Sequence, residues 1–134
     1  MEVYNKNMID VQKQINFWRG SSIEDWQVAQ ELVDNHRLRH GLYFAQLAIE
    51  KLLKAHVCLT TQDLAPRIHN LIRLAEIANL ELNSTQIDIL AEMSTFNIEG
   101  QYPDSILPRP SIEETRLIIR RATEVYDWLT NQLP

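Results

Sequence analysis

The side chains that could do chemistry gather on one stripe of an apolar stretch, residues 42–59. At 100° per residue, the apolar side chains of this stretch cover well over half of a helix circumference, which predicts a central, buried helix. The narrow remaining arc carries Glu50, Lys51 and Lys54. Two interpretations stay open. Either the two ammonium groups and the carboxylate line a groove, or they form a solvated stripe with a weak Glu50–Lys54 pair.

The four histidines fall in three different settings. His36 and His40 are four residues apart, a spacing compatible with a metal, but no carboxylate pattern accompanies them and no metal site is expected. His56 lies in the apolar arc of the central helix and is expected to be a hydrogen-bonded core residue. His69 stands at a predicted helix start, in PRIHNL, and is the histidine expected to point into a functional groove.

Several site types are excluded by inspection. The sequence has no glycine-rich phosphate loop, no Glu-x-x-His pair for a di-iron bundle and no His-Glu-x-x-His zinc motif. Its single cysteine, Cys58, excludes an intrachain disulfide framework and a zinc site with several cysteine ligands, and is expected to fill space in the core. We therefore expect no cofactor and no metal.

Composition indicates one globular domain. The 134 residues are 45% hydrophobic and 23% charged, and no apolar run approaches the roughly 18 residues of a membrane span. The opening MEVYNKNMID shows no secretory pattern, which predicts a cytoplasmic protein without membrane contact. The net charge of -5 argues against a broad nucleic-acid surface but allows a small basic pocket. Basic residues are locally dense: eighteen residues contain Arg37, Arg39, Lys51 and Lys54, and thirteen contain Arg109, Arg116, Arg120 and Arg121.

Helical periodicity, scarce glycine and the absence of strand patterns predict an all-α, up-and-down bundle of five or six helices. A first helix over 4–18 ends at Arg19-Gly20, and a capping box in SSIED, residues 21–25, begins the second. After a turn within 35–41 and the central helix, a helix begins near Pro66. Further helices are expected from Asn83 or Ser84, with Ile87, Leu90 and Ala91 inward and an end before Gly100, and from Pro110 with a Ser111–Glu114 capping box. The proline-rich segment 99–110 is the one long loop.

Three segments, in order and spacing, resemble the HEPN domain family. They are GLYFAQLAIEKLLKA at 41–55, His69 with Leu71 and Leu74, and Gln101-Tyr102-Pro103-Asp104. The resemblance runs from about Ser22 to the C-terminus, so residues 22–134 are expected to form the core bundle of a single HEPN-like domain and residues 1–20 an N-terminal extension helix. It implies a helical bundle that forms a homodimer, often encoded beside a minimal nucleotidyltransferase. Many members are RNA-cleaving toxins or nucleotide-binding modules.

Two motif positions depart from the family pattern. The ribonuclease branch uses an Arg, a spacer of about four to six residues and a His, and no pair here has that separation: Arg37 precedes His40 by three positions and Arg67 precedes His69 by two. Gln101 replaces the usual Arg of the loop motif, and a neutral amide lacks the bidentate cationic grip of a guanidinium on a phosphate.

The predicted ligand-binding set combines the central stripe with the two later motifs: Glu50, Lys51, Lys54, His69, Gln101, Tyr102 and Asp104. The lysines would face phosphate, Glu50 and Asp104 would orient them, and His69 and Tyr102 would hydrogen-bond or stack. The preferred hypothesis is a nucleotide- or RNA-binding module that acts with a nucleotidyltransferase-type partner, as in a toxin-antitoxin system. The alternatives are a metal-independent ribonuclease toxin and a purely structural dimerisation bundle.

Overall fold

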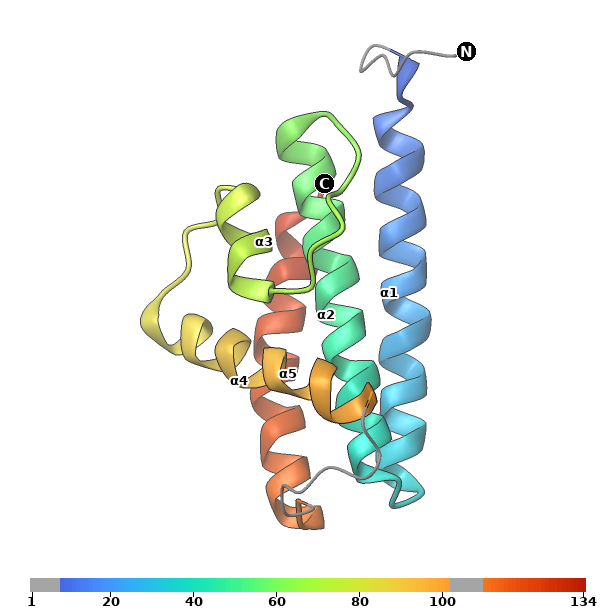
Figure 1. The fold of residues 1–134 in the computed structure, drawn as a ribbon, viewed down its shortest axis with the longest axis vertical. Coiled ribbons are helices and arrows are strands. Elements are labelled where there is room, and N and C mark those ends of the chain that lie inside the picture. The colour runs from blue at the N-terminus through green and yellow to red at the C-terminus, as the bar shows by residue number, and fades with distance from the viewer. Residues whose placement is uncertain (1–7, 102–109) are drawn as a thin grey trace.

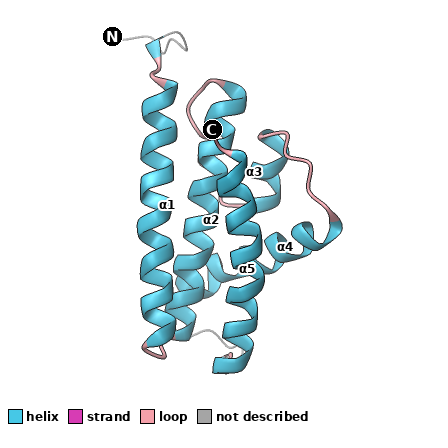
Figure 2. Cartoon of the chain, turned by 180° about the vertical axis from the view of Figure 1, so that it is seen from behind, coloured by secondary structure: helices cyan, strands magenta, loops and turns pink. Residues whose placement is uncertain are grey.

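The computed structural model describes residues 8–101 and 110–134, and within these it contains five helices and no strand. The helices are α1 (Val11–Asp34), α2 (Leu38–Thr61), α3 (Leu71–Ile77), α4 (Ser84–Gln101) and α5 (Ile112–Gln132). The long helices α1, α2 and α5 lie side by side, with α2 antiparallel to α1, while α3 and α4 cover the front of α2 (Figure 1). The view from behind shows that the described residues form helices connected by loops (Figure 2). The predicted all-α bundle is confirmed.

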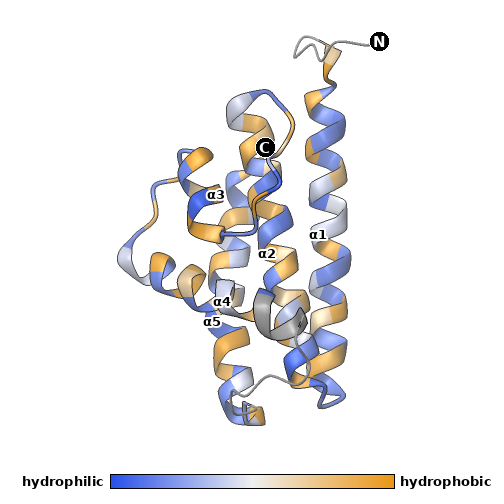
Figure 3. Cartoon of the chain, in the orientation of Figure 1, coloured by the Kyte–Doolittle hydropathy of each residue, from blue (hydrophilic) through white to orange (hydrophobic). Residues whose placement is uncertain are grey.

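Helix α2 is the centre of the fold, as its sequence predicts. It contacts each of the other four helices, and most of its side chains are buried, including Leu42, Ile49 and Leu52. By contrast, hydrophilic and hydrophobic residues alternate along α1, as expected for a helix with one face in solvent (Figure 3). The solvated-stripe interpretation of α2 is wrong, because Glu50 and Lys54 are both buried.

The predicted helix break at Arg19-Gly20 is also wrong, since α1 runs without interruption to Asp34. Gly20 has no positive φ, the conformation that usually makes a glycine end a helix. The serines that follow do not cap a new helix. Ser22 Oγ donates to the Ala48 carbonyl at 2.5 Å, and Ser21 Oγ accepts from Lys51 Nζ at 2.8 Å, so both tie α1 to α2.

Gly20 therefore occupies a helix interior, and a Cβ added there would meet no atom within 4 Å. Gly20→Ala is expected to raise the free energy of unfolding by about 0.5–1 kcal/mol, because alanine loses less backbone entropy in a helix than glycine. Chemical denaturation of the two proteins checks this. A lower stability of the variant would contradict a continuous α1.

Three other helix boundaries or faces differ from expectation. Helix α3 begins at Leu71, where Asn70 Oδ1 accepts from the Arg73 N–H at 3.0 Å, rather than near Pro66. Helix α4 continues through Gly100 to Gln101. Its inward face also differs, because Ile87 and Ala91 are exposed. Among residues 84–97 of α4, whose side chains the structure describes, Ile89, Leu90, Met93 and Phe96 are buried.

The two predicted caps on the later helices are confirmed. Asn83 Oδ1 accepts from the Gln86 N–H at 2.8 Å, and Gln86 Oε1 accepts from the Asn83 N–H at 2.9 Å, which is a reciprocal capping box. Ser111 Oγ accepts from the Glu114 N–H at 3.0 Å at the start of α5. These contacts fix where α4 and α5 begin, on either side of the segment 102–109.

Two buried side chains of α2 behave as the sequence indicates. Cys58 is buried in the core, and burial raises the pKa of its thiol. His56 lies with Nε2 2.8 Å from the Leu129 carbonyl of α5, so the ring links the two helices. Burial is the main cause that lowers the pKa of His56 below its ordinary value of 6.5, and the positive charge of Arg19 adds to it.

The lowered pKa of His56 makes folding stability depend on pH. The unfolded chain binds the proton more readily than the folded chain, so the free energy of unfolding falls as the pH drops below 6.5 and stops falling below the folded-state pKa. Each unit of difference corresponds to about 1.4 kcal/mol. We expect His56→Gln, which keeps a hydrogen-bond donor, to lose part of this dependence between about pH 7.5 and pH 5.5. Equal pH dependence of the wild type and the variant in chemical denaturation would contradict the assignment.

None of the helices in the described ranges has the length and apolar content needed to cross a membrane. Within the same ranges, no group of histidine, cysteine, aspartate and glutamate side chains is arranged to hold a metal ion. What positions chemistry in this fold is instead a buried carboxylate in the middle of α2.

Candidate functional site

Glu50 is the hub of a buried polar network on α2. Its side chain is only 5% exposed, and the carboxylate accepts a hydrogen bond from Gln46 Nε2 at 3.0 Å. Lys54 Nζ lies 3.3 Å from Oε2, one helical turn further along. His69 Nδ1, from the loop before α3, lies 3.2 Å from Oε1 and 3.1 Å from Oε2. The structure therefore brings three of the predicted site residues together: Glu50, Lys54 and His69.

Lys54 is occupied by the protein itself. It is 7% exposed, pairs with Glu50, and its Nζ lies 5.1 Å from the centroid of the Trp18 ring on α1. An ammonium over an indole face is a favourable cation–π arrangement, and burial strengthens it. Lys54 thus stabilises the Glu50 carboxylate from inside the bundle and does not project into solvent.

Lys51 turns the other way. Its Nζ lies 2.6 Å from Asp25 Oδ2 and donates to Ser21 Oγ, so it joins α2 to α1. One residue along a helix corresponds to a rotation of 100°, which places Lys51 on a different face from Glu50. The structure does not bring Lys51 into the network of Glu50.

The loop motif contributes no described side chain. Gln101 is the last residue of α4, and its side chain lies outside the described residues, as do Tyr102 and Asp104. Their predicted roles stay predictions.

His69 opens the buried network to the surface. Its side chain is 61% exposed and borders a pocket of 340 Å³ that also contains Asn70, Ser94, Thr95 and Asn97. We call this the His69 pocket. Except for the imidazole, its lining is neutral and can donate or accept hydrogen bonds. Ser94, Thr95 and Asn97 of α4 belong to no sequence motif. Only the packing of α4 beside Asn70, the N-cap of α3, shows that they line a pocket.

The Glu50 carboxylate sets the chemistry of the imidazole. A carboxylate only accepts, so the imidazole donates from Nδ1. This assignment follows from the hydrogen-bond geometry. The ring is thus held in one orientation by a buried group, and its second nitrogen, Nε2, is available to a ligand.

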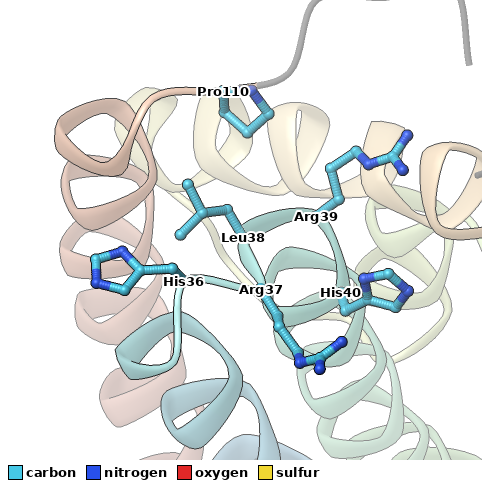
Figure 4. A pocket seen from close by; sticks show the side chains of 6 residues that line it. All are labelled: His36, Arg37, Leu38, Arg39, His40 and Pro110. Carbon is cyan, nitrogen blue, oxygen red and sulfur yellow. The ribbon is translucent and has the colours of Figure 1, made fainter.

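A second pocket, of 430 Å³, lies at the turn between α1 and α2. We call it the basic pocket. The residues that line it are His36, Arg37, Leu38, Arg39, His40 and Pro110 (Figure 4). Four of the five residues 36–40 (HRLRH) are basic, but the predicted site does not include them. The sequence alone could not identify this pocket, because only the fold shows that residues 36–40 border a cavity next to the start of α5.

Comparisons with known proteins agree with this architecture. No curated protein matches the sequence. The crystal structure of TT1696 from Thermus thermophilus has the same fold, with a TM-score of 0.74 at 16% sequence identity, over 90% of this chain and 98% of that one. The sequence model of the HEPN domain matches residues 15–133, which extends the resemblance noted from residue 22 further into α1. HEPN domains are in general nucleotide- or RNA-related modules. By this match over most of its length, the chain belongs to the HEPN domain family.

Proposed function

We propose that this chain is a nucleotide- or RNA-binding module and that its ligand lies in the His69 pocket. The observation that carries the proposal is the Glu50–His69 contact, in which a buried carboxylate orients an exposed imidazole toward neutral polar side chains. Neutral amides and hydroxyls suit the hydroxyl groups and base edges of a nucleoside better than they suit phosphate charge. Histidine also offers a flat ring on which an unstacked base can lie.

The dimensions of the pocket support a ligand of this kind. Its volume of 340 Å³ falls at the lower end of the range for small-molecule sites, which is about 300–1,000 Å³. One wall is the loop that ends at Asn70, and the other is α4, through Ser94, Thr95 and Asn97. Ser94 Oγ accepts from the Leu71 N–H at 3.3 Å, so the two walls are linked and the pocket is formed before a ligand enters.

Binding is tested by substituting His69 and Asn97 separately with alanine. We expect each variant to bind a mononucleotide or a short single-stranded RNA about tenfold more weakly, because one hydrogen bond to a ligand is worth about 1.4 kcal/mol. Arg73→Ala is the matched control, since it removes an exposed cation of α3 whose only described ion pair is with Glu76. Isothermal titration and fluorescence anisotropy measure the affinities. Wild-type affinity in both pocket variants would contradict the proposal.

A metal-independent ribonuclease is the second candidate, and the same contact favours it. A histidine hydrogen-bonded to a carboxylate can act as a general base or acid toward a ribose hydroxyl. The sequence lacks the Arg-spacer-His motif, and for that reason binding without cleavage is our first proposal. Cleavage of labelled RNA in the presence of a chelator, lost in His69→Ala and kept in Arg73→Ala, would establish the ribonuclease instead.

The partners are proposed from the family resemblance. We propose that the protein acts in the cytoplasm as a homodimer, together with a nucleotidyltransferase-type partner of the kind found in toxin-antitoxin systems. Affinity purification of the tagged protein from its host, followed by mass spectrometry, tests the partner. Light scattering tests the dimer. Recovery of the homodimer alone, without nucleotide, RNA or a nucleotidyltransferase, would favour a structural dimerisation bundle.

A further inference from the structure

The structure assigns a phosphate-binding site to the basic pocket at the α1–α2 turn, apart from the His69 pocket. Four cationic or potentially cationic side chains, His36, Arg37, Arg39 and His40, border its 430 Å³. Figure 4 shows His36 on one side of Leu38, Arg39 and His40 on the other, and Pro110 above Leu38; in this view the Arg37 and Arg39 side chains extend in different directions. No predicted role of the sequence motifs uses these residues.

The positive charge of the pocket is not neutralised within the described part of the chain. Neither Arg37 nor Arg39 forms an ion pair or a side-chain hydrogen bond there, and the nearest acidic residue in sequence, Asp34, pairs with neither of them. The lysines of α2 differ, since Lys51 and Lys54 each have a carboxylate partner. A guanidinium group without a carboxylate partner in the protein is available to pair with a bound anion.

The backbone adds donors at the same place. Helix α2 begins after Arg37, whose side chain forms no capping hydrogen bond, and the first helix N–H to find a carbonyl is that of Gly41, which bonds to Arg37 at 2.9 Å. The N–H groups of Leu38, Arg39 and His40 have no described partner. The start of a 24-residue helix therefore points free donors and the positive end of its dipole at the pocket.

This chemistry selects phosphate. Guanidinium groups bind phosphate oxygens through paired hydrogen bonds, and helix N–H groups add to them. The volume exceeds what a single phosphate needs and can hold several linked phosphates, as in a nucleoside triphosphate, or part of an RNA backbone. The choice of a nucleoside triphosphate or an RNA backbone as the source of the phosphate rests on the proposed function. The phosphate site itself does not.

The test replaces both arginines and compares three probes. Arg37→Gln/Arg39→Gln removes two cations from side chains that are exposed or half-buried, so the fold is expected to stay intact. The matched control is Arg116→Gln/Arg120→Gln, which removes two cations from exposed side chains of α5. The probes are inorganic tripolyphosphate, ATP and a short single-stranded RNA, each titrated by calorimetry or anisotropy. Circular dichroism confirms folding of every variant.

We expect Arg37→Gln/Arg39→Gln to weaken binding of tripolyphosphate at least tenfold, while the α5 control binds as the wild type does. A matching loss for ATP identifies nucleotide polyphosphate as the source. A loss for RNA, with a salt dependence reduced by about 1.4 in the slope of log K against log salt, identifies the RNA backbone. Unchanged affinity of the Arg37→Gln/Arg39→Gln variant, equal losses in both double variants, or no binding of any probe by the wild type overturns the inference.

Adenosine separates this inference from the proposed function, because it carries no phosphate. Adenosine binding lost in His69→Ala and kept in Arg37→Gln/Arg39→Gln supports the His69 pocket alone. Tripolyphosphate binding that depends on the two arginines, in a protein that binds no adenosine, supports the phosphate site and contradicts the His69 pocket. Either proposal can thus fail without the other.

Discussion

Replacing Glu50 by alanine is expected to lower the free energy of unfolding by about 3–5 kcal/mol, because it leaves a buried charge without its partner. Lys54 is buried and has one described carboxylate partner, Glu50. The Trp18 ring under its ammonium offsets only part of the loss, since a cation–π contact is worth about 1–2 kcal/mol. Gln46 and His69 lose their acceptor at the same time. Urea denaturation followed by circular dichroism measures the change.

The control for Glu50→Ala is an exposed pair of similar chain spacing. Glu76 pairs with Arg73 at 3.2 Å on α3, with both side chains more than half exposed, and Glu76→Ala is expected to change stability by less than about 1 kcal/mol. The double variant Glu50→Gln/Lys54→Met removes the charged pair as a unit and should recover most of the loss. A Glu50→Ala variant as stable as Glu76→Ala would show that the Glu50 network is not a buried ion pair.

The second large effect is expected at Gly41, where the packing of α2 against α1 leaves little room for a side chain. A Cβ added at Gly41 would lie 2.6 Å from Val33 Cγ2 and 3.2 Å from the Ala29 carbonyl oxygen. Valine at position 41 is expected to destabilise the protein by about 3 kcal/mol, because neither the branched Val33 side chain nor the α1 backbone can move away freely. Alanine should cost less, about 1–2 kcal/mol, since its higher helix propensity offsets part of the clash.

Two further variants separate crowding from helix propensity. Gly20→Ala makes the same substitution in an open helix interior and is expected to stabilise, so the opposite signs at positions 20 and 41 would isolate the contact. Val33→Ala removes the nearest crowded atom. In a double-mutant cycle, Gly41→Ala/Val33→Ala should be more stable than the sum of the single effects predicts. Strict additivity would contradict close packing of α1 on α2 at Gly41.

The sequence predicts the elements of this fold better than it predicts their ends. The broad apolar arc of α2 identifies the central helix correctly, because a helix that is apolar almost all round must be covered on several sides. Gly20 led to a wrong helix end. Glycine often ends a helix, but it is also tolerated inside a helix that tertiary contacts stabilise. Ile87 led to a wrong inward face for α4, because it begins an apolar stripe that competes with the buried one. Only packing against the other helices shows that the inward face contains Ile89 and Met93.

The site shows the same limit. The four-residue spacing of Glu50 and Lys54 predicts one helix face, and the structure confirms that they pair. Their burial was not predictable, since it depends on α1 and on the loop carrying His69, which lie far from them in sequence. Lys51 lies on a different face of α2 from Glu50, and its partner there, Asp25 of α1, could not be identified from the spacing along α2. The basic run at 36–40 is visible in the sequence, but its pocket requires the fold.

The most direct measurement of ligand binding in the His69 pocket is an NMR titration of the ¹⁵N-labelled protein with AMP, UMP and a short single-stranded RNA. Our account predicts that backbone amide signals of His69, Asn70, Ser94, Thr95 and Asn97 shift in a saturable way with at least one of these ligands. The side-chain amide signal of Asn97 should shift with them. Saturable shifts confined to other parts of the bundle, or no shifts with any of the three, would contradict it.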